Sequence, residues 1–216
     1  MAILCAWASM SENGTTEGTP GDQTGSEVKI GDWYYFGQTQ VFRWKKAGLA
    51  KNAASLAGGC ANNDHIGYGQ FGTGNDDDRL SFYRAWAAVS FDIAALTTDC
   101  NTDCSAFIGA IVNACGVSVD PGVTTATMYS VLMATDKFNY YSSAAYTQSD
   151  TLLQAGDILC DPAHHCIMVI DDIPPAVGPV QPAGTIDPAV LLSAYYAKKK
   201  RYEEGRIYRR QKPLLL

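Results

Sequence analysis

The segment 104–115 (CSAFIGAIVNAC) is the part of the chain that most restricts its fold. Wound as a helix, it is apolar on nearly every side, and Gly116 directly after it is typical of a helix end. A helix without a polar face is stable only where other elements cover it. We therefore expect it in the middle of a domain, with the rest of the chain packed around it.

The flanking sequence predicts both strands and helices for that domain. Aromatic and β-branched residues predict two strands within 28–44, and two short apolar runs predict strands at 157–160 and 165–170. Helices are expected at 45–61, at 79–96 behind the acidic run Asn75–Asp78, and at 123–134, whereas 11–27 is expected to be a loop. The predicted fold class is α+β, with helices packed on an antiparallel sheet.

Composition adds limits on size and partners. With 216 residues, 47% of them hydrophobic, the chain is long enough for one sizeable core, and no apolar run approaches the roughly 20 residues of a membrane-spanning helix. The net charge is −6, yet residues 198–212 carry eight of the sixteen basic residues against two acidic ones. The acidic remainder argues against a nucleic-acid groove in the main domain, whereas the basic end could contact any polyanion or remain a solvated tail.

A change of composition suggests where the main domain ends. Residues 173–188 are rich in proline and residues 189–205 have helical spacing, so we expect a domain over 1–172 followed by a proline-rich crossing and a basic C-terminal helix or tail over 173–216. Seven cysteines, an odd number, favour folding in a reducing cytoplasm. The first basic residue is Lys29, so the N-terminus does not resemble a signal peptide.

Asp103-Cys104-Ser105 is the motif that suggests chemistry, because it opens the apolar helix. The positive end of a helix stabilises a thiolate, which is the nucleophilic form of cysteine, and its free N–H groups can stabilise an oxyanion. A cysteine nucleophile also needs a base, and His164-His165 stands at the start of a predicted strand, with His65 as the competitor. Taken alone, however, such a cysteine is usually core filler and such a histidine usually solvated.

The string TTDCNTDCSAFIGAIVNACG, followed by LQAGDIL and HHCIMVI, resembles the NlpC-type cell-wall peptidases. These are papain-like cysteine hydrolases of bacteria and phages with a D-C-S motif, a later G-D-[IL] strand and a strand that opens with histidine. The similarity extends over most of residues 8–171, because the N-terminal part also resembles phage lysins of this group.

The resemblance implies roles for individual residues. Cys104 would be the nucleophile and His165 the general base, because in the family the histidine is followed directly by alternating strand residues. Asp103 and Ser105 match positions that line the substrate-peptide site, and the resemblance matches Tyr68 to a family tyrosine near the thiol. The third residue, which orients the imidazole, stays open among Asp171, Asp172 and Gln181.

The implied function is hydrolysis of an amide bond in peptidoglycan without a cofactor. The bond is either that between muramic acid and L-alanine or one within the stem peptide, and no motif distinguishes them. The implied protein is a phage or prophage lysin, made in the cytoplasm without a signal peptide and acting on the cell wall after release. The alternative is a non-catalytic wall-binding or virion structural module on the same fold.

Two metal sites compete with this interpretation. Zinc could be held by thiols and imidazoles drawn from residues 100–104 and 160–166, but their spacing differs from that of common zinc sites. Calcium could be held by Asp76–Asp78, but the other ligands of a calcium loop are missing. Of the remaining thiols, Cys166 is expected to point away from His165 into the core, and Cys100 is a candidate for a disulfide with Cys104.

Overall fold

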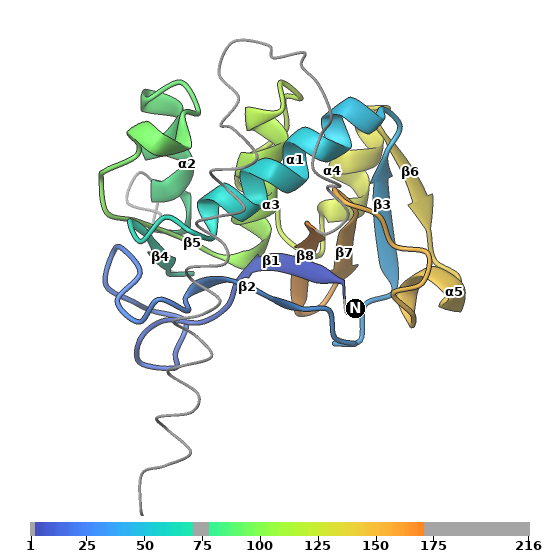
Figure 1. Ribbon diagram of the computed structural model, residues 1–216, viewed down its shortest axis with the longest axis horizontal. Coiled ribbons are helices and arrows are strands. Elements are labelled where there is room, and N and C mark those ends of the chain that lie inside the picture. The colour runs from blue at the N-terminus through green and yellow to red at the C-terminus, as the bar shows by residue number, and fades with distance from the viewer. Residues whose placement is uncertain (1–2, 71–77, 171–216) are drawn as a thin grey trace, which may run out of the picture. The chain divides into compact units, whose positions relative to one another are not determined.

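The computed structural model describes residues 3–70 and 78–170, which form strands in two sheets and the helices around them (Figure 1). The strands are β1 (Leu4–Ala8), β2 (Val28–Asp32), β3 (Gln40–Trp44), β4 (Ile66–Tyr68), β5 (Cys100–Thr102), β6 (Phe138–Tyr141), β7 (Ile158–Asp161) and β8 (His165–Val169). The α-helices are α1 (Ala47–Cys60), α2 (Ser81–Ala88), α3 (Cys104–Ala114), α4 (Met128–Ala134) and α5 (Ala144–Thr147), with short 3₁₀ turns η2 (Asp78–Leu80) and η3 (Ile93–Ala95).

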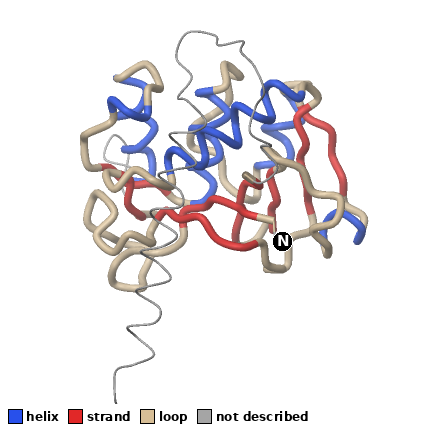
Figure 2. The backbone as a smooth tube through the Cα atoms, viewed as in Figure 1, coloured by secondary structure: helices blue, strands red, loops and turns tan. Residues whose placement is uncertain are grey.

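The main sheet has six strands in the order β2-β1-β8-β7-β3-β6, and every neighbouring pair is antiparallel. The second sheet is the parallel pair β4 and β5, in which Tyr68 lies opposite Thr102. Figure 2 shows the strands in red, with helices α1, α3 and α4 gathered along the main sheet. The predicted α+β class, with helices packed on an antiparallel sheet as in a papain-like fold, is confirmed.

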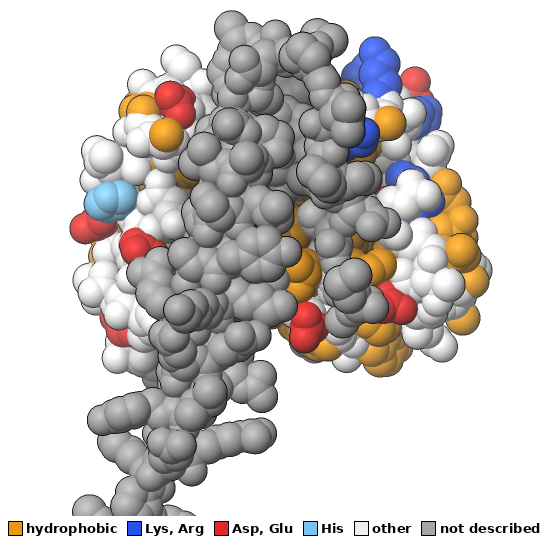
Figure 3. All heavy atoms as spheres, viewed as in Figure 1, with side chains coloured by type: hydrophobic (Ala, Val, Ile, Leu, Met, Phe, Trp, Pro, Cys, Tyr) orange, Lys and Arg blue, Asp and Glu red, His pale blue; other side chains and the backbone are white. Residues whose placement is uncertain are grey.

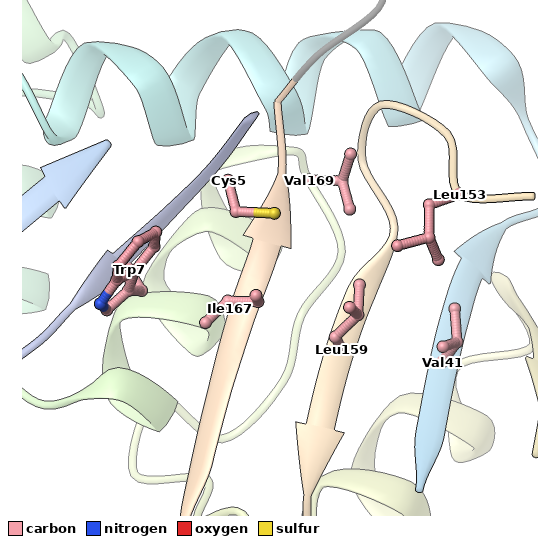
Figure 4. Close-up of a cluster of buried hydrophobic side chains, with 7 residues drawn as sticks. All are labelled: Cys5, Trp7, Val41, Leu153, Leu159, Ile167 and Val169. Carbon is pink, nitrogen blue, oxygen red and sulfur yellow. The ribbon is translucent and has the colours of Figure 1, made fainter. Parts of the chain in front are cut away.

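The two faces of the main sheet carry different side chains. One face holds a cluster of buried apolar residues from the central strands and the loop before β7, shown in Figure 4: Cys5, Trp7, Val41, Leu153, Leu159, Ile167 and Val169. Because side chains alternate along a strand, Cys166 and Met168 face the other way. That second face meets the helices, as the contact between the rings of Phe42 and Tyr129 of α4 shows.

Helix α3 is the buried central helix that its composition predicts. All residues from Cys104 to Val112 are buried, and the helix contacts β8, β1, α1 and α2. Gly116 follows with φ of 77°, a left-handed conformation that glycine adopts without steric cost and that stops the helix. The prediction of a helix over 104–115 is therefore confirmed.

Strand β1 was not predicted from the sequence, although it lies inside the main sheet between β2 and β8. Residues Cys5 to Ala8 are all buried, so the segment does not alternate between polar and apolar side chains. A strand covered on both faces lacks the period of two by which strands are recognised. Five apolar residues then look like any other short apolar run.

Two predicted helices are shorter than expected. The helix expected over 79–96 is divided into η2, α2 and η3, and Ser90 and Phe91 after α2 have φ of 56° and 59°. Phe91 packs its ring against the buried Trp86 with centroids 5.4 Å apart, and this contact favours the break. The helix expected over 123–134 begins only at Met128. The proline-rich crossing and basic tail of 173–216 lie outside the described residues, as do Asp76 and Asp77.

The surface shown in Figure 3 has its lysine and arginine side chains gathered near the start of α1, whereas acidic side chains are scattered over it. Lys45, Lys46 and Lys51 are exposed at this end of the molecule. No helix among the described residues is long and apolar enough to cross a membrane.

Candidate active site

The nucleophile candidate stands at the first turn of α3, where Asp103 caps the helix. Asp103 has an extended backbone, and its Oδ1 accepts hydrogen bonds from the N–H groups of Ser105 at 2.8 Å and Ala106 at 2.7 Å. Such a cap satisfies two N–H groups that have no partner within the helix. Cys104 is thereby fixed at the positive end of the helix dipole, and only 5% of it is exposed.

The thiol of Cys104 is the acidic one of the site. Hydrogen bonds to its sulfur from Cys166 and then from His165, together with the charge of His165, lower the pKa of Cys104 to about 6. Burial and the negative charge of Asp103 act in the opposite direction. The balance favours a thiolate at neutral pH, which is the form that attacks a carbonyl carbon.

His165 is the histidine that the fold brings to Cys104. It is the first residue of β8, it is half-buried, and its interaction with the Cys104 thiol lowers the pKa of that thiol. The neighbouring His164 is mostly exposed and its Nδ1 lies 2.9 Å from Asp161 Oδ2, whereas His65 pairs with Asp99 at 2.6 Å before β4. The geometry therefore selects the same histidine as the motif.

Cys166 is a member of the site that sequence reasoning missed. As predicted, it is buried and points to the face opposite His165, which is the helix-facing side of the sheet. On that side its thiol hydrogen bonds to Cys104, and burial together with this neighbour raises the pKa of Cys166 well above its usual range. Cys166 thus remains a neutral donor beside the thiolate. The alternation of β8 indicates its face, but only the packing of α3 on β8 brings the two thiols together.

The other residues suggested by the resemblance lie around the same helix end. Tyr68 is 4% exposed and lies opposite Thr102, two residues before Cys104, and burial followed by the charge of Cys104 raises the pKa of its phenol. Its oxygen accepts a hydrogen bond from Gln70 Nε2 at 2.9 Å. Ser105 is buried and its Oγ lies 2.8 Å from Asp103 Oδ1. The structure thus gives Asp103 and Ser105 partners within the chain, and a contact of either with substrate stays a prediction.

Arg79 completes this end of the helix and was also missed. Its guanidinium donates to Asp103 Oδ2 at 3.0 Å and to the carbonyl of Gly122 at 2.5 Å. Both side chains of the ion pair are largely buried, with 15% and 8% exposed. The ion pair connects η2 to the start of α3. The sequence did not indicate this role, because Arg79 follows an acidic run that was interpreted only as the start of a helix.

An aromatic loop between β2 and β3 borders the histidine. The ring of Phe36 meets the ring of His165 edge-on, with centroids 5.2 Å apart and an interplanar angle of 71°. Tyr34 packs on Phe36 at 5.5 Å and on Trp7 at 5.6 Å. The sequence predicted two strands within 28–44, joined by a glycine turn, so an aromatic loop beside the site was not expected.

The other residues considered for the site include some within the described ranges and some outside them. Asp171, Asp172 and Gln181, proposed for the third position, lie outside the described residues. Within the described ranges all seven cysteines are free, and the Cys100 thiol donates to the carbonyl of His65 rather than pairing with Cys104. No group of three or more histidine, cysteine or acidic side chains in 3–70 and 78–170 is arranged to hold a metal ion.

Comparison with known proteins identifies the family. No curated protein and no solved structure matches the chain. The family model of the endolysin-like domain (ELLD) matches residues 5–174, a range that contains Cys104, His165 and both sheets except for Leu4, the first residue of β1. The match covers well over half of the chain, and the chain therefore belongs to the endolysin-like domain family.

Proposed function

We propose that this domain is a cysteine hydrolase of the NlpC type that cleaves an amide bond in peptidoglycan, with Cys104 as nucleophile and His165 as general base and acid. Membership of the endolysin-like family indicates a hydrolase that acts on the cell wall. The observation that carries the finer proposal is the placement of Cys104 at the start of α3 next to the start of β8, where His165 lowers the pKa of the thiol. A buried thiol with a pKa of about 6 beside an imidazole is arranged for nucleophilic attack.

The reaction follows from this geometry in two steps. The Cys104 thiolate attacks the amide carbonyl carbon, and the positive end of α3 stabilises the negative oxygen of the tetrahedral intermediate. His165 in its protonated form gives its proton to the leaving amine, the C–N bond breaks, and a thioester remains on Cys104. His165 then takes a proton from water, the hydroxide attacks the thioester, and the C–S bond breaks to restore the Cys104 thiolate. The carboxylic acid product leaves and releases its proton to solvent.

The substrate would be either the amide between muramic acid and L-alanine or an amide of the stem peptide, since both expose the same carbonyl chemistry to the thiolate. As a lysin carried by a phage or prophage, the protein would meet this substrate after release from the cytoplasm. The basic residues of 198–212 would add attraction to anionic wall polymers.

The test is to incubate bacterial peptidoglycan with the wild type and with Cys104→Ala, and to identify fragments and new amino ends by mass spectrometry. We expect fragments from the wild type alone, with the new end identifying the bond. Cys115→Ala, which removes a thiol from the other end of α3, is the matched control and should remain active. His165→Ala should be inactive, and His164→Ala active. A wild type that binds the wall but releases nothing would favour the non-catalytic module.

A further inference from the structure

The imidazole of His165 is held in the structure by an aromatic ring. Phe36 meets it edge-on with centroids 5.2 Å apart. Asp161 faces His165 across the β7–β8 ladder, but its Oδ2 pairs with His164 instead. Within residues 3–70 and 78–170, no carboxylate or amide side chain hydrogen bonds to the His165 ring. In this part of the chain, the contact beside Cys104 that fixes the angle of the ring is therefore the one with Phe36.

Phe36 itself is anchored from two directions. Its backbone N–H donates to Oε1 of Gln38 at 2.9 Å, and Gln38 is only 1% exposed. Its ring packs on Tyr34, which packs in turn on Trp7, a buried residue of β1. The ring that touches His165 is thus connected to the core of the main sheet. A loop side chain fixed in this way can hold a neighbouring ring in one orientation.

We propose that Phe36 is a positioning residue for the Cys104–His165 pair, and that its ring keeps the imidazole at the angle at which it hydrogen bonds to the thiol. The proposal rests on the proposed function, in which His165 moves the protons. Histidine rotates about two side-chain bonds, and a ring packed against it excludes the rotamers that turn away from the sulfur. Such preorganisation of a base raises the rate without touching the substrate.

Loss of the Phe36 ring would raise the pKa of Cys104. The hydrogen bond and charge of His165 help to lower the pKa of the thiol, so an imidazole that spends less time beside the sulfur lowers it less. Other titratable or charged groups face the pair from the cap of α3, from β4, β7 and β8 and from the loop before β3: Asp103, Tyr68, Cys160, Asp161, Cys166 and Tyr34. Of these, Tyr34 packs on Phe36, but its pKa is raised above its usual value by burial, so it carries no charge where Cys104 titrates. A shift in the pKa of Cys104 on replacing Phe36 would therefore show that the His165 imidazole has moved away from the thiol.

The experiment compares Phe36→Leu, which removes the ring, with Phe36→Tyr, which keeps it. Tyr35→Leu is the matched control, because Tyr35 is the adjacent aromatic residue and is 54% exposed. The first measurement needs no substrate: the pH dependence of alkylation of Cys104 by iodoacetamide, followed by mass spectrometry of the peptide that contains it. The second measurement is kcat and KM on a soluble peptidoglycan fragment.

We expect Phe36→Leu to raise the alkylation pKa of Cys104 by roughly half a unit to one unit, a three- to tenfold smaller thiolate fraction below the pKa. We also expect kcat to fall about tenfold with KM little changed, because the ring acts on the base and not on substrate binding. Phe36→Tyr should restore both values, and Tyr35→Leu should match the wild type.

Wild-type alkylation and kcat in a folded Phe36→Leu variant would overturn the proposal. If Phe36→Leu does not fold, as judged by urea unfolding, Phe36→Met carries the same test, because its flexible chain fills the space without a ring. A wild type that releases no wall fragment would overturn the proposed function alone, since the alkylation shift still tests Phe36. Conversely, the wild type could release peptidoglycan fragments while Phe36→Leu keeps the wild-type alkylation profile and kcat. That result would overturn only the role of Phe36.

Discussion

At the scale of single residues, the thiol of Cys104 differs in acidity from other thiols of the chain. Hydrogen bonds from Cys166 and His165 lower the pKa of Cys104 to about 6. Burial raises the pKa of Cys100, Cys115 and Cys160 to about 12. Alkylation at neutral pH should therefore label Cys104 selectively, with a rate that falls as pH drops through about 6. Peptide mapping after brief labelling at several pH values checks this, and equal labelling of Cys115 would contradict it.

The contact between Cys104 and Cys166 gives a second prediction at this scale. Cys166→Ala removes the hydrogen bond that contributes most to the low pKa of Cys104. We expect the alkylation pKa to rise by roughly one unit, and the low-pH limb of kcat/KM to move the same way, because a thiolate without its donor is less stable. Cys166→Ser keeps a donor and should lie between the two. An unchanged profile in Cys166→Ala would assign the low pKa to His165 alone.

The sequence predicted the pair Cys104 and His165 but not their neighbours, for a physical reason. The start of a helix and the start of a strand are local features, marked by Asp103 before the thiol and by the apolar residues after the histidine. The contacts with Cys166 and Phe36 depend on how α3 and the loop before β3 pack against β8, and no short motif encodes that packing.

At the scale of elements, α3 depends on Asp103, the residue that caps its start. Asp103→Ala removes the cap and one partner of Arg79, and we expect a loss of roughly 1–3 kcal/mol in the free energy of unfolding. Asp103→Asn keeps an oxygen for the two N–H groups, so it should lose less. Because the charge of Asp103 raises the pKa of Cys104, the Asn variant should also alkylate at lower pH. Urea unfolding and alkylation measure the two effects, and equal losses in both variants would assign the stability to the ion pair.

Elements were predictable to different degrees from their sequences. The apolar helix over 104–115 and the strands near 157–160 and 165–170 were found because composition and turn residues mark both ends. Strand β1 was missed because it is buried on both faces and therefore lacks alternation. Helix α2 was predicted too long because the packing of Phe91 on Trp86 overrides local helix propensity.

At the scale of the whole molecule, Arg43 joins β3 to the start of β7. Its Nε donates to Asp157 Oδ1 at 2.8 Å and its guanidinium also donates to Oδ2 at 2.6 Å, while Asp157 is only 1% exposed. The rings of Tyr141 and Tyr146 lie within 5.5 Å of the guanidinium. A carboxylate as deeply buried as this one depends on its partner for compensation.

Arg43→Ala should therefore lower the free energy of unfolding by roughly 3–5 kcal/mol at pH 7, since it leaves Asp157 buried without its cation. Burial raises the pKa of Asp157 even in the wild type, so the folded state binds the proton more tightly than the unfolded chain. Stability linked to that proton is present at low pH and is lost as pH rises through the folded-state pKa. The loss in the free energy of unfolding caused by Arg43→Ala should therefore be smaller at pH 5 than at pH 7, as measured by urea unfolding.

Lys45→Ala is the matched control, because Lys45 follows the same strand and pairs with Asp136 on an exposed surface. Such a pair contributes about 0–1 kcal/mol, and its loss should be small at both pH values. A deficit for Arg43→Ala that stays constant with pH would show that Asp157 remains ionised without its partner.

The pairing of β1 with β8 has a consequence for the order in which the protein matures. Cys5 lies opposite Val169, and the N–H of Ile170 donates to the carbonyl of Leu4, so the two ends of the family domain meet in adjacent strands. Contacts so distant in sequence close late in folding. A nascent chain that has emerged only as far as α3 therefore carries the thiol without His165. The hydrolase gains its complete site only when synthesis of the domain is finished.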